Sequence, residues 1–403
     1  MAWDGKLDVL VIGGGMISQE VILPTVFQER RRGKVGRVLV SSLSGDINQQ
    51  VRAALPGEPF APYPDPDKVD PKKPFPELFR QALTDLGGKG IVIVATPDHL
   101  HTPMVLAALE AGYDVSCMKP LCLKVAEAHQ IDAKARDRAR YVLTDYHKRH
   151  DRAVRAARHR YRKGDLGEML HGHAWIEEPK YMPLDKFKRW AAESSPFEYI
   201  GVHYVDVYYF VTGLKPKRLV AFGQKKYLPT RGSDAFDAVQ ATIEWEDGSV
   251  LWVQTSWVLS AKGSAMTRQG LNLVGTMGEY WADHMDRNLH FVTEEKGFEH
   301  YNPNFFKAYD SWEGEGLTDH VGYGYESVQQ ALDDVRSILK ETEGLPEARA
   351  VARRKQILEG WKDLRALPHQ ALIGVAVNEA VRLSIEHGSA WVGFDEQMYP
   401  KLC

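Results

Sequence analysis

The sequence predicts an α/β fold in two domains, an N-terminal doubly wound parallel sheet followed by an α+β domain with a largely antiparallel open sheet. Three observations lead to this prediction. Within residues 1–148, apolar runs alternate with helical patterns, which is typical of parallel strands covered by helices. Within residues 149–403 that alternation stops, period-2 strands follow one another, and the last third is helical. The length of 403 residues also favours two domains.

The composition is that of an ordinary globular chain. Hydrophobic residues make up 44%, charged residues 26%, and the net charge is −3, so neither nucleic acid nor a membrane is indicated as a partner. No apolar run approaches the roughly 20 residues of a membrane span, and no signal peptide is recognisable. The three cysteines lack metal-ligand spacing. We therefore expect a cytoplasmic protein without a metal site.

The first predicted elements are a strand, a glycine turn and a helix. Leu7–Ile12 is a continuous apolar run, as in a strand that is buried on both faces. Three glycines, Gly13–Gly15, follow it directly, and a helical pattern extends from Met16 to about Gln28. This order is that of the first βα unit of a Rossmann domain.

The glycine turn predicts a dinucleotide-binding site. Gly13 permits the tight turn, and Gly15 lets a pyrophosphate approach the backbone. The first helical residues, Met16 and Ile17, supply N–H groups at the positive end of the helix dipole. Ser18 stands at the third small position of the G-x-G-x-x-G pattern. The position of the motif, between a strand and a helix, supports this interpretation.

Further βα units continue the parallel sheet. A Pro- and Asp-rich segment, residues 55–76, is predicted to be an irregular surface loop. The remaining strands of this domain are predicted at 38–42, at the start of 90–101, at 113–118 and at 141–145.

The end of the second strand bears on the choice of cofactor. An acidic residue that binds the adenosine ribose is expected there, but Ser41 and Ser42 occupy the position and Asp46 comes later. No arginine follows immediately, so a site for a 2′-phosphate is not indicated either. We favour NAD, with Ser42 as the contact residue, and NADP stays open.

Several motifs occur in the order found in one protein family. They are GGGMIS, ATPDHLH, MKPLCLKVAEA, YHKRHDRAV, GDLGEM, GVHYVDVYYFVTG, GTMGEYW and AVNEAVRLSIEHGSAWV. Through them, nearly the whole chain resembles the Gfo/Idh/MocA family of NAD(P)-dependent oxidoreductases, most of which act on sugars and polyols. The resemblance implies a Rossmann domain at 1–148 and a substrate-binding and oligomerisation domain at 149–403. It also implies a homo-oligomer, a dimer or a tetramer.

Lys119 is the main catalytic candidate. It follows the strand YDVSCM directly, and ligands of doubly wound sheets bind at the carboxyl ends of strands. The resemblance implies that Lys119 is the lysine of the family's EKP motif, next to the cofactor, although Met118 stands where the family has Glu. Beside a nicotinamide cation and partly desolvated, a lysine favours its neutral form and can take a hydroxyl proton.

The stretch 198–213 predicts a helix that carries the second catalytic candidate. His203 and Asp206 are three residues apart and share a face, and Tyr199 lies one turn earlier. In the family pattern D-x-x-x-H-x-x-D, the His and the second Asp match, while Tyr199 replaces the first Asp. The resemblance implies that His203 works with Lys119 as an acid/base pair. Asp206 either binds substrate or orients His203, with a structural hydrogen bond as the alternative, and the Tyr199 hydroxyl is suited to a sugar hydroxyl.

Other polar residues complete the predicted site. Thr96 and Pro97, with His101 in the ATP-x-x-x-H spacing, are expected at the cofactor. His147 follows the last parallel strand, and Arg149 matches the family's Arg in YHKRHD, so both are expected at the substrate. A structural role as a hydrogen-bonded loop residue is the alternative for each histidine.

The sequence therefore predicts hydride transfer between a nicotinamide cofactor and a secondary alcohol of a sugar, glycoside or polyol. Two alternatives stay open. An NAD-dependent glycosidase working through a transient keto sugar would use the same residues but would produce no net NADH. A non-catalytic dinucleotide-binding regulator would need neither Lys119 nor His203.

Overall fold

The structure is a computed structural model, and it describes residues 3–403. The chain forms two compact units. The first unit comprises the residues up to Leu121, Glu127–His147 and Phe306–Gln370, and the second comprises Cys122–Ala126, Lys148–Phe305 and Ala371–Cys403.

The return of residues 306–370 to the first unit differs from the predicted division, which assigned all of 149–403 to the second domain. The reason is packing. Helix α8 (Tyr323–Thr342) lies against α1 (Leu23–Arg31) and against the last strand of the parallel sheet. An apolar face of α8 is thereby buried, and it includes Val328, Leu332 and Val335.

The first unit contains the predicted parallel sheet, which is confirmed. Its six strands have the order β3-β2-β1-β4-β5-β6, and every neighbouring pair is parallel. The strands β4, β5 and β6 are buried at every position, as expected where helices cover both faces. The bounds are β1 (Leu7–Ile12), β2 (Val35–Ser41), β3 (Ala61–Tyr63), β4 (Gly90–Val94), β5 (Asp114–Met118) and β6 (Val142–Asp145).

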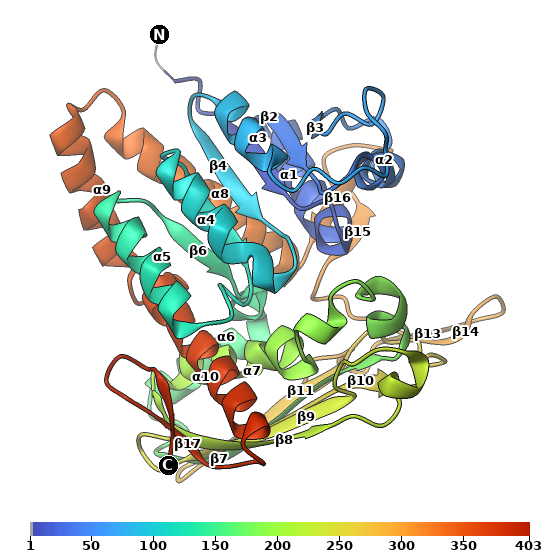
Figure 1. Ribbon diagram of the computed structural model, residues 1–403, viewed down its shortest axis with the longest axis vertical. Coiled ribbons are helices and arrows are strands. Elements are labelled where there is room, and N and C mark those ends of the chain that lie inside the picture. The colour runs from blue at the N-terminus through green and yellow to red at the C-terminus, as the bar shows by residue number, and fades with distance from the viewer. Residues whose placement is uncertain (1–2) are drawn as a thin grey trace. The chain divides into compact units, whose positions relative to one another are not determined.

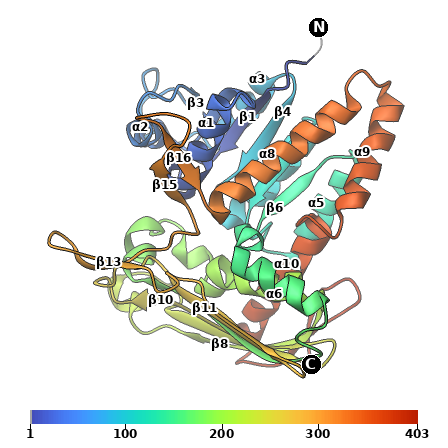
Figure 2. The ribbon, with the colours of Figure 1, turned by 180° about the vertical axis from the view of Figure 1, so that it is seen from behind.

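Helices lie on both faces of this sheet. One face carries α3, α4 and α5, and the other carries α1 and α8 (Figures 1 and 2). The helices of this unit not yet given are α2 (Gly45–Ala54), α3 (Leu78–Leu86), α4 (His101–Glu110), α5 (Val125–Asp137) and α9 (Glu347–Trp361).

Strand β3 corrects the prediction of an irregular loop for residues 55–76. Ala61–Tyr63 pairs in parallel with the end of β2 and forms the edge of the sheet. Its central residue, Pro62, is tolerated because an edge strand needs no N–H on its outer side. A strand is therefore present within a run whose proline content predicted a loop.

The second unit contains an eight-stranded sheet in the order β12-β11-β7-β10-β9-β8-β17-β18. Only β7 and β10 pair in parallel, so the predicted largely antiparallel sheet is confirmed. The bounds are β7 (Met169–Pro179), β8 (Pro216–Gln224), β9 (Ala238–Trp245), β10 (Val250–Leu259), β11 (Arg268–Gly275), β12 (Glu279–Asp283), β17 (Val392–Phe394) and β18 (Pro400–Leu402).

Helices α6 (Arg152–Arg162), α7 (Val202–Thr212) and α10 (Pro368–Glu386) cover one face of this sheet (Figure 1). The opposite face carries large exposed side chains, among them Phe222 at 50% and Trp252 at 42% exposure. Two small hairpins add β13 (His290–Thr293) with β14 (Gly297–His300) and β15 (Lys307–Asp310) with β16 (Thr318–Val321). Across residues 3–403, no helix combines the length and the apolar character that a membrane crossing requires.

Candidate active site

The turn after β1 has the geometry that its three glycines predict. Gly13 has a φ of +110°, and a Cβ there would lie 2.3 Å from the carbonyl oxygen of Ala95. A Cβ on Gly14 would lie 2.4 Å from Ser42 Oγ, whereas one on Gly15 would enter open space. The first two glycines are therefore required for packing, and the open side of the turn lies over Gly15.

The helix that follows closes the turn. Ser18 Oγ donates to the carbonyl oxygen of Gly13, so the serine at the third small position holds the loop against the first helical turn. The helical residues begin at Met16 and Ile17, whose N–H groups belong to the unpaired first turn of a helix. Open space over Gly15 next to a helix N-terminus fits a pyrophosphate.

The side chain and the backbone N–H of Ser42 both make hydrogen bonds within the protein. It is 5% exposed, and its Oγ donates to Asn48 Oδ1 at 2.7 Å. Its backbone N–H donates to the carbonyl oxygen of Tyr63. Ser42 thus packs against Gly14 of the glycine turn, and its contact with a ribose stays a prediction.

His101 joins the loop after β4 to the turn after β5. Its ring is 1% exposed, with Nδ1 2.7 Å from the carbonyl oxygen of Pro120 and Nε2 2.9 Å from that of Thr96. Burial lowers the pKa of His101, and the neutral ring can donate to only one carbonyl at a time. The ring therefore positions two loops, while Thr96 and Pro97 are half-buried and accessible to a ligand.

Lys119 lies where the sequence predicts it, directly after β5. The ends of β1, β4 and β5 align, because Ile12 pairs with Val94 and Val94 pairs with Cys117. The glycine turn, the loop after β4 and the half-buried Lys119 consequently share one edge of the sheet. This is the edge at which doubly wound sheets bind their ligands.

A buried carboxylate at the same edge was not recognised from the sequence. Asp145, the last residue of β6, pairs with Met118 and is 5% exposed. Burial raises the pKa of Asp145 to about 6, against the opposing effects of Ser327 and Lys119. The available signal was an acidic residue that ends a short apolar strand.

His147 follows shortly after β6 and is also placed in the first unit. Its ring stacks on Tyr323 of α8, with the ring centroids 5.5 Å apart and an interplanar angle of 25°. The histidine thereby has a packing partner of its own, and the predicted contact with substrate remains a proposal.

The second unit positions His203 near the start of α7. A short helical segment, Phe197–Gly201, leads into that helix. A Cβ on Gly201 would lie 2.9 Å from Thr255 Cγ2, so this end of the helix presses closely on β10. His203 is 4% exposed, within a stretch of α7 that is buried at every position from Val202 to Tyr208.

Asp206 and Arg149 bind each other. The Arg149 Nε donates to Oδ2 at 2.9 Å and Nη2 donates to Oδ1 at 2.6 Å, with side chains 2% and 7% exposed. Burial raises the pKa of Asp206, and Arg149 opposes that rise. Of the three readings of Asp206, these contacts fit the structural hydrogen bond, because both carboxylate oxygens bind the guanidinium.

Tyr199 belongs to an aromatic cluster. Its ring centroid lies 4.8 Å from that of Phe187, 5.0 Å from Trp190 and 6.2 Å from Trp257. Tyr199 itself is half-buried. Phe187 and Trp257 are buried, so Tyr199 and Trp190 are the members that a ligand could reach, and an indole beside a phenol suits the CH face and hydroxyls of a sugar ring.

A second buried network in this unit was also missed. Lys148 is 2% exposed, donates to Gln269 Oε1, and lies 5.1 Å above the Tyr204 ring. His284 has the Tyr204 and Tyr280 hydroxyls at 3.0 Å from its two nitrogens. Burial, assisted by Lys148, lowers the pKa of His284 to about 3, so the ring is neutral. Lys148 adjoins Arg149 in a basic stretch that resembles a solvated face.

The catalytic candidates divide between the units, with Lys119 in the first and His203 in the second. Their meeting at one site is therefore a proposal. Among residues 3–403, no three His, Cys, Asp or Glu residues form a group able to hold a metal ion.

Comparison with known proteins decides the family. Residues 7–146 match the profile of an oxidoreductase family with an NAD-binding Rossmann fold, and residues 154–281 match the Gfo/Idh/MocA C-terminal domain. The chain belongs to the Gfo/Idh/MocA family. Its first unit thus carries the NAD-binding Rossmann domain of these oxidoreductases, and the open glycine turn fits that cofactor.

Curated relatives of this Gfo/Idh/MocA protein include sugar-active enzymes. D-Glucoside 3-dehydrogenase of Escherichia coli is 24% identical over 43% of this chain and 53% of its own length. The 1,5-anhydro-D-fructose reductase of Ensifer adhaerens is 27% identical over 40% of this chain and 48% of its own length. The chain spans about half the length of these curated relatives.

Solved structures share the whole fold of this family member. An inositol dehydrogenase homolog from Azotobacter vinelandii, complexed with NADH and myo-inositol, has a TM-score of 0.68 and 20% identity, covering 96% of this chain and 98% of its own. Myo-inositol 2-dehydrogenase from Lactobacillus plantarum also has a TM-score of 0.68, with 16% identity over 97% and 100%. At these identities the likeness establishes the fold alone.

The two ends of the glycine turn predict different outcomes for the same substitution. Gly13→Ala is expected to destabilise the chain, because alanine at φ +110° costs about 1–3 kcal/mol and its Cβ would meet Ala95. Gly15→Ala is expected to fold normally but to weaken NADH binding by about tenfold. Thermal unfolding and NADH fluorescence titration measure both effects. Wild-type affinity in a folded Gly15→Ala variant would contradict the assignment.

Proposed function

We propose that this chain transfers hydride between a nicotinamide cofactor and a secondary alcohol of a sugar, glycoside or polyol. The family match over both domains and the sugar-active relatives support this proposal. The observation that carries it is the position of Lys119, a half-buried lysine at the same sheet edge as the open glycine turn.

The proposed chemistry assigns the proton to Lys119. A bound nicotinamide would supply the hydride acceptor for oxidation of the alcohol and the hydride donor for reduction. Lys119 Nζ takes the proton of the substrate hydroxyl during oxidation and returns it during reduction. His203, from the second unit, is its proposed partner and donates a hydrogen bond to the same reacting hydroxyl or accepts one from it.

The remaining residues are proposed to hold the substrate and the cofactor. Tyr199 and the half-buried Trp190 accommodate the CH face of the substrate. Arg149, fixed by its ion pair, and His147 supply further polar contacts. On the cofactor side, Gly15 and the N–H groups after it hold the pyrophosphate, and Thr96 contacts the ring end.

A substrate panel tests this function. Sugars, glycosides and polyols are incubated with the purified chain and NAD or NADP, NADH or NADPH absorbance is recorded, and products are identified by mass spectrometry. Net reduction of the nucleotide with a matching keto product supports the proposal. A tightly held nucleotide without turnover of any panel member would favour the regulator instead.

An NAD-dependent glycosidase is the second candidate, because Met118 and Tyr199 depart from the family pattern. In that reaction a transient keto sugar is formed and reduced again on the same chain. Release of the aglycone from a glycoside without net NADH would identify it.

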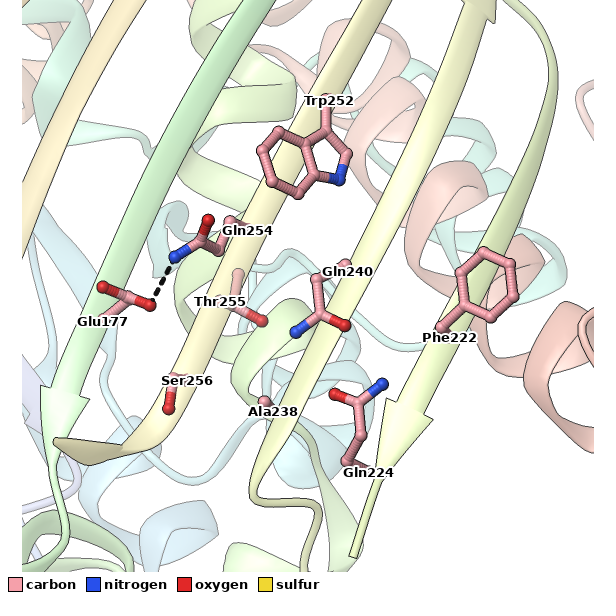
Figure 3. A pocket seen from close by; sticks show the side chains of 9 residues that line it. All are labelled: Glu177, Phe222, Gln224, Ala238, Gln240, Trp252, Gln254, Thr255 and Ser256. Atoms are coloured by element: carbon pink, nitrogen blue, oxygen red, sulfur yellow. Dashed lines mark hydrogen bonds between the residues drawn. The ribbon is translucent and has the colours of Figure 1, made fainter.

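We also propose that the chain forms a homo-oligomer through the bare face of the eight-stranded sheet. Trp252 and Phe222 are exposed there beside Gln240 and Gln254, and Gln254 donates to Glu177 at 2.7 Å (Figure 3). These side chains line a depression of about 560 Å³. Aromatic groups surrounded by amides that both donate and accept hydrogen bonds suit contact with a second copy.

Trp252→Glu is expected to reduce the oligomer to a smaller species, because it introduces a charge at the centre of this face. Light scattering coupled to gel filtration measures the mass of each species. Trp312→Glu is the matched control, because Trp312 is a fully exposed tryptophan that belongs to the first unit and not to this sheet. An unchanged mass for Trp252→Glu would exclude this face as the interface.

A cytoplasmic location is part of the same proposal. Cys117 and Cys122 are buried thiols, Cys403 is an exposed thiol, and none forms a disulfide. Free thiols suit a reducing compartment. Fractionation of cells that express the chain tests this location.

A further inference from the structure

Asp145 occupies a place at the sheet edge that the proposed chemistry does not use. It ends β6, and its Cα partner on β5 is Met118, the residue before Lys119. Neighbouring strands lie about 4.8 Å apart, so Asp145 adjoins the backbone that carries the lysine. Both residues belong to the first unit.

The carboxylate of Asp145 is an unusual group at that position. The residue is 5% exposed, and its Oδ1 has no hydrogen-bond partner within residues 3–403. Ser327 hydrogen-bonds the carboxylate, but burying a carboxylate with one oxygen unpaired is still costly, so the charge of this group calls for a specific explanation. The cation that acts on Asp145 electrostatically is Lys119.

Other ionisable groups lie on the neighbouring elements, and among them His101 has its pKa lowered by burial and also by Lys119. On α8, Ser327 also favours the charged form of Asp145, Tyr323 stacks on His147, and Glu326 lies in the first turn. Tyr146 follows Asp145 directly in the chain. Met118, directly opposite, carries no charge.

We propose that Asp145 is a positioning residue for Lys119: its buried carboxylate on the adjacent strand holds the lysine side chain at the sheet edge and keeps the ammonium charged. This inference rests on the proposed acid/base role of Lys119. It assigns to β6 the negative charge that Met118 does not provide on β5. A lysine held in this way is charged before the substrate and cofactor arrive.

Competitive acetylation of the cofactor-free chain tests the proposal without reference to activity. Lysine labelling is measured across a pH series, and the midpoint for the peptide that contains Lys119 is read by mass spectrometry. In Asp145→Asn the midpoint is expected to fall by about one pH unit, because an anion near a lysine favours its charged form. Asp137→Asn, which removes an exposed carboxylate on α5, should leave the midpoint unchanged. An unchanged midpoint in Asp145→Asn overturns the proposal.

A second variant and a second measurement keep the proposal testable if Asp145→Asn does not fold. Asp145→Ser removes the charge with a smaller side chain, so it replaces Asp145→Asn if the amide does not fold. In the oxidation direction, the limb of the kcat/KM profile that reports neutral Lys119 should move to lower pH by the same amount. The two failures are distinguishable. If the proposed function is wrong, Lys119→Met keeps full activity. If only this inference is wrong, Lys119→Met is inactive but the acetylation midpoint of Lys119 is the same in Asp145→Asn as in wild type.

Discussion

Replacing Lys119 with methionine is expected to lower kcat/KM by about 10²- to 10⁴-fold, the usual contribution of a positioned acid or base. Methionine keeps much of the length and apolar stem of lysine but cannot transfer a proton. Because Lys119 is only half-buried and lies beyond the end of β5, the fold should be retained. Steady-state kinetics with the substrate identified by the panel, together with NADH fluorescence titration, measure the loss and show that the cofactor still binds.

Lys124→Met is the matched control for that experiment. Lys124 is an exposed lysine just before α5, and its removal changes the net charge by the same amount. It should retain wild-type kcat/KM. Activity of Lys119→Met equal to that of the control would refute the acid/base assignment. The same assay on His203→Asn examines the second member of the pair.

Arg149→Met is expected to lower the free energy of unfolding by about 3–5 kcal/mol, because it leaves the Asp206 carboxylate buried without its partner. Replacing both residues, as in Arg149→Met with Asp206→Leu, should recover part of that loss, since no charge then remains buried. Urea unfolding of the cofactor-free chain measures each value. Lys362→Met, which breaks an exposed and solvent-screened pair with Glu359, should leave the free energy of unfolding nearly unchanged.

The deficit of Arg149→Met should also depend on pH. Burial raises the pKa of Asp206 even in the presence of Arg149, and without the guanidinium that rise is unopposed. The folded variant then binds more protons than the unfolded chain between the unfolded pKa of about 3.9 and the raised folded value. Its stability relative to wild type should therefore increase as the pH falls from 7 towards 5. A deficit independent of pH would mean that Asp206 keeps the same charge in the folded variant as in the folded wild type, so that loss of Arg149 does not raise its pKa further.

Strong periodicities made most of the fold predictable. The apolar run Leu7–Ile12 is the strand β1, and the alternation in Ala238–Trp245 corresponds to an alternating burial of β9. Asp247-Gly248 closes the turn between β9 and β10, with Gly248 at φ +85°. Each of these signals is local, so it survives without knowledge of the tertiary structure.

Elements that depend on distant packing were not predictable. The hairpin strands β13 to β16 are short and largely exposed, so they carry no alternating pattern. The assignment of residues 306–370 to the first unit depends on the contact of α8 with α1, which joins segments far apart in the chain. Periodicity identifies a helix but does not identify what covers it.

The candidate site shows the same division. Lys119 was predictable because the end of a buried strand is visible in the sequence. The ion pair of Arg149 with Asp206 was not, because the two residues are 57 positions apart and burial of a charge leaves no local trace. Asp145 was overlooked for the same reason, since its importance lies in what the neighbouring strand carries.

The late return of α8 to the parallel sheet has a consequence for biosynthesis. Residues 3–147 leave the ribosome first, but the apolar side that α8 covers stays uncovered until Phe306–Gln370 have been translated. During that interval the nascent chain exposes the kind of surface that chaperones bind and that aggregates form from. The nucleotide-binding unit is thus begun before residues 148–305 are made and completed only after them.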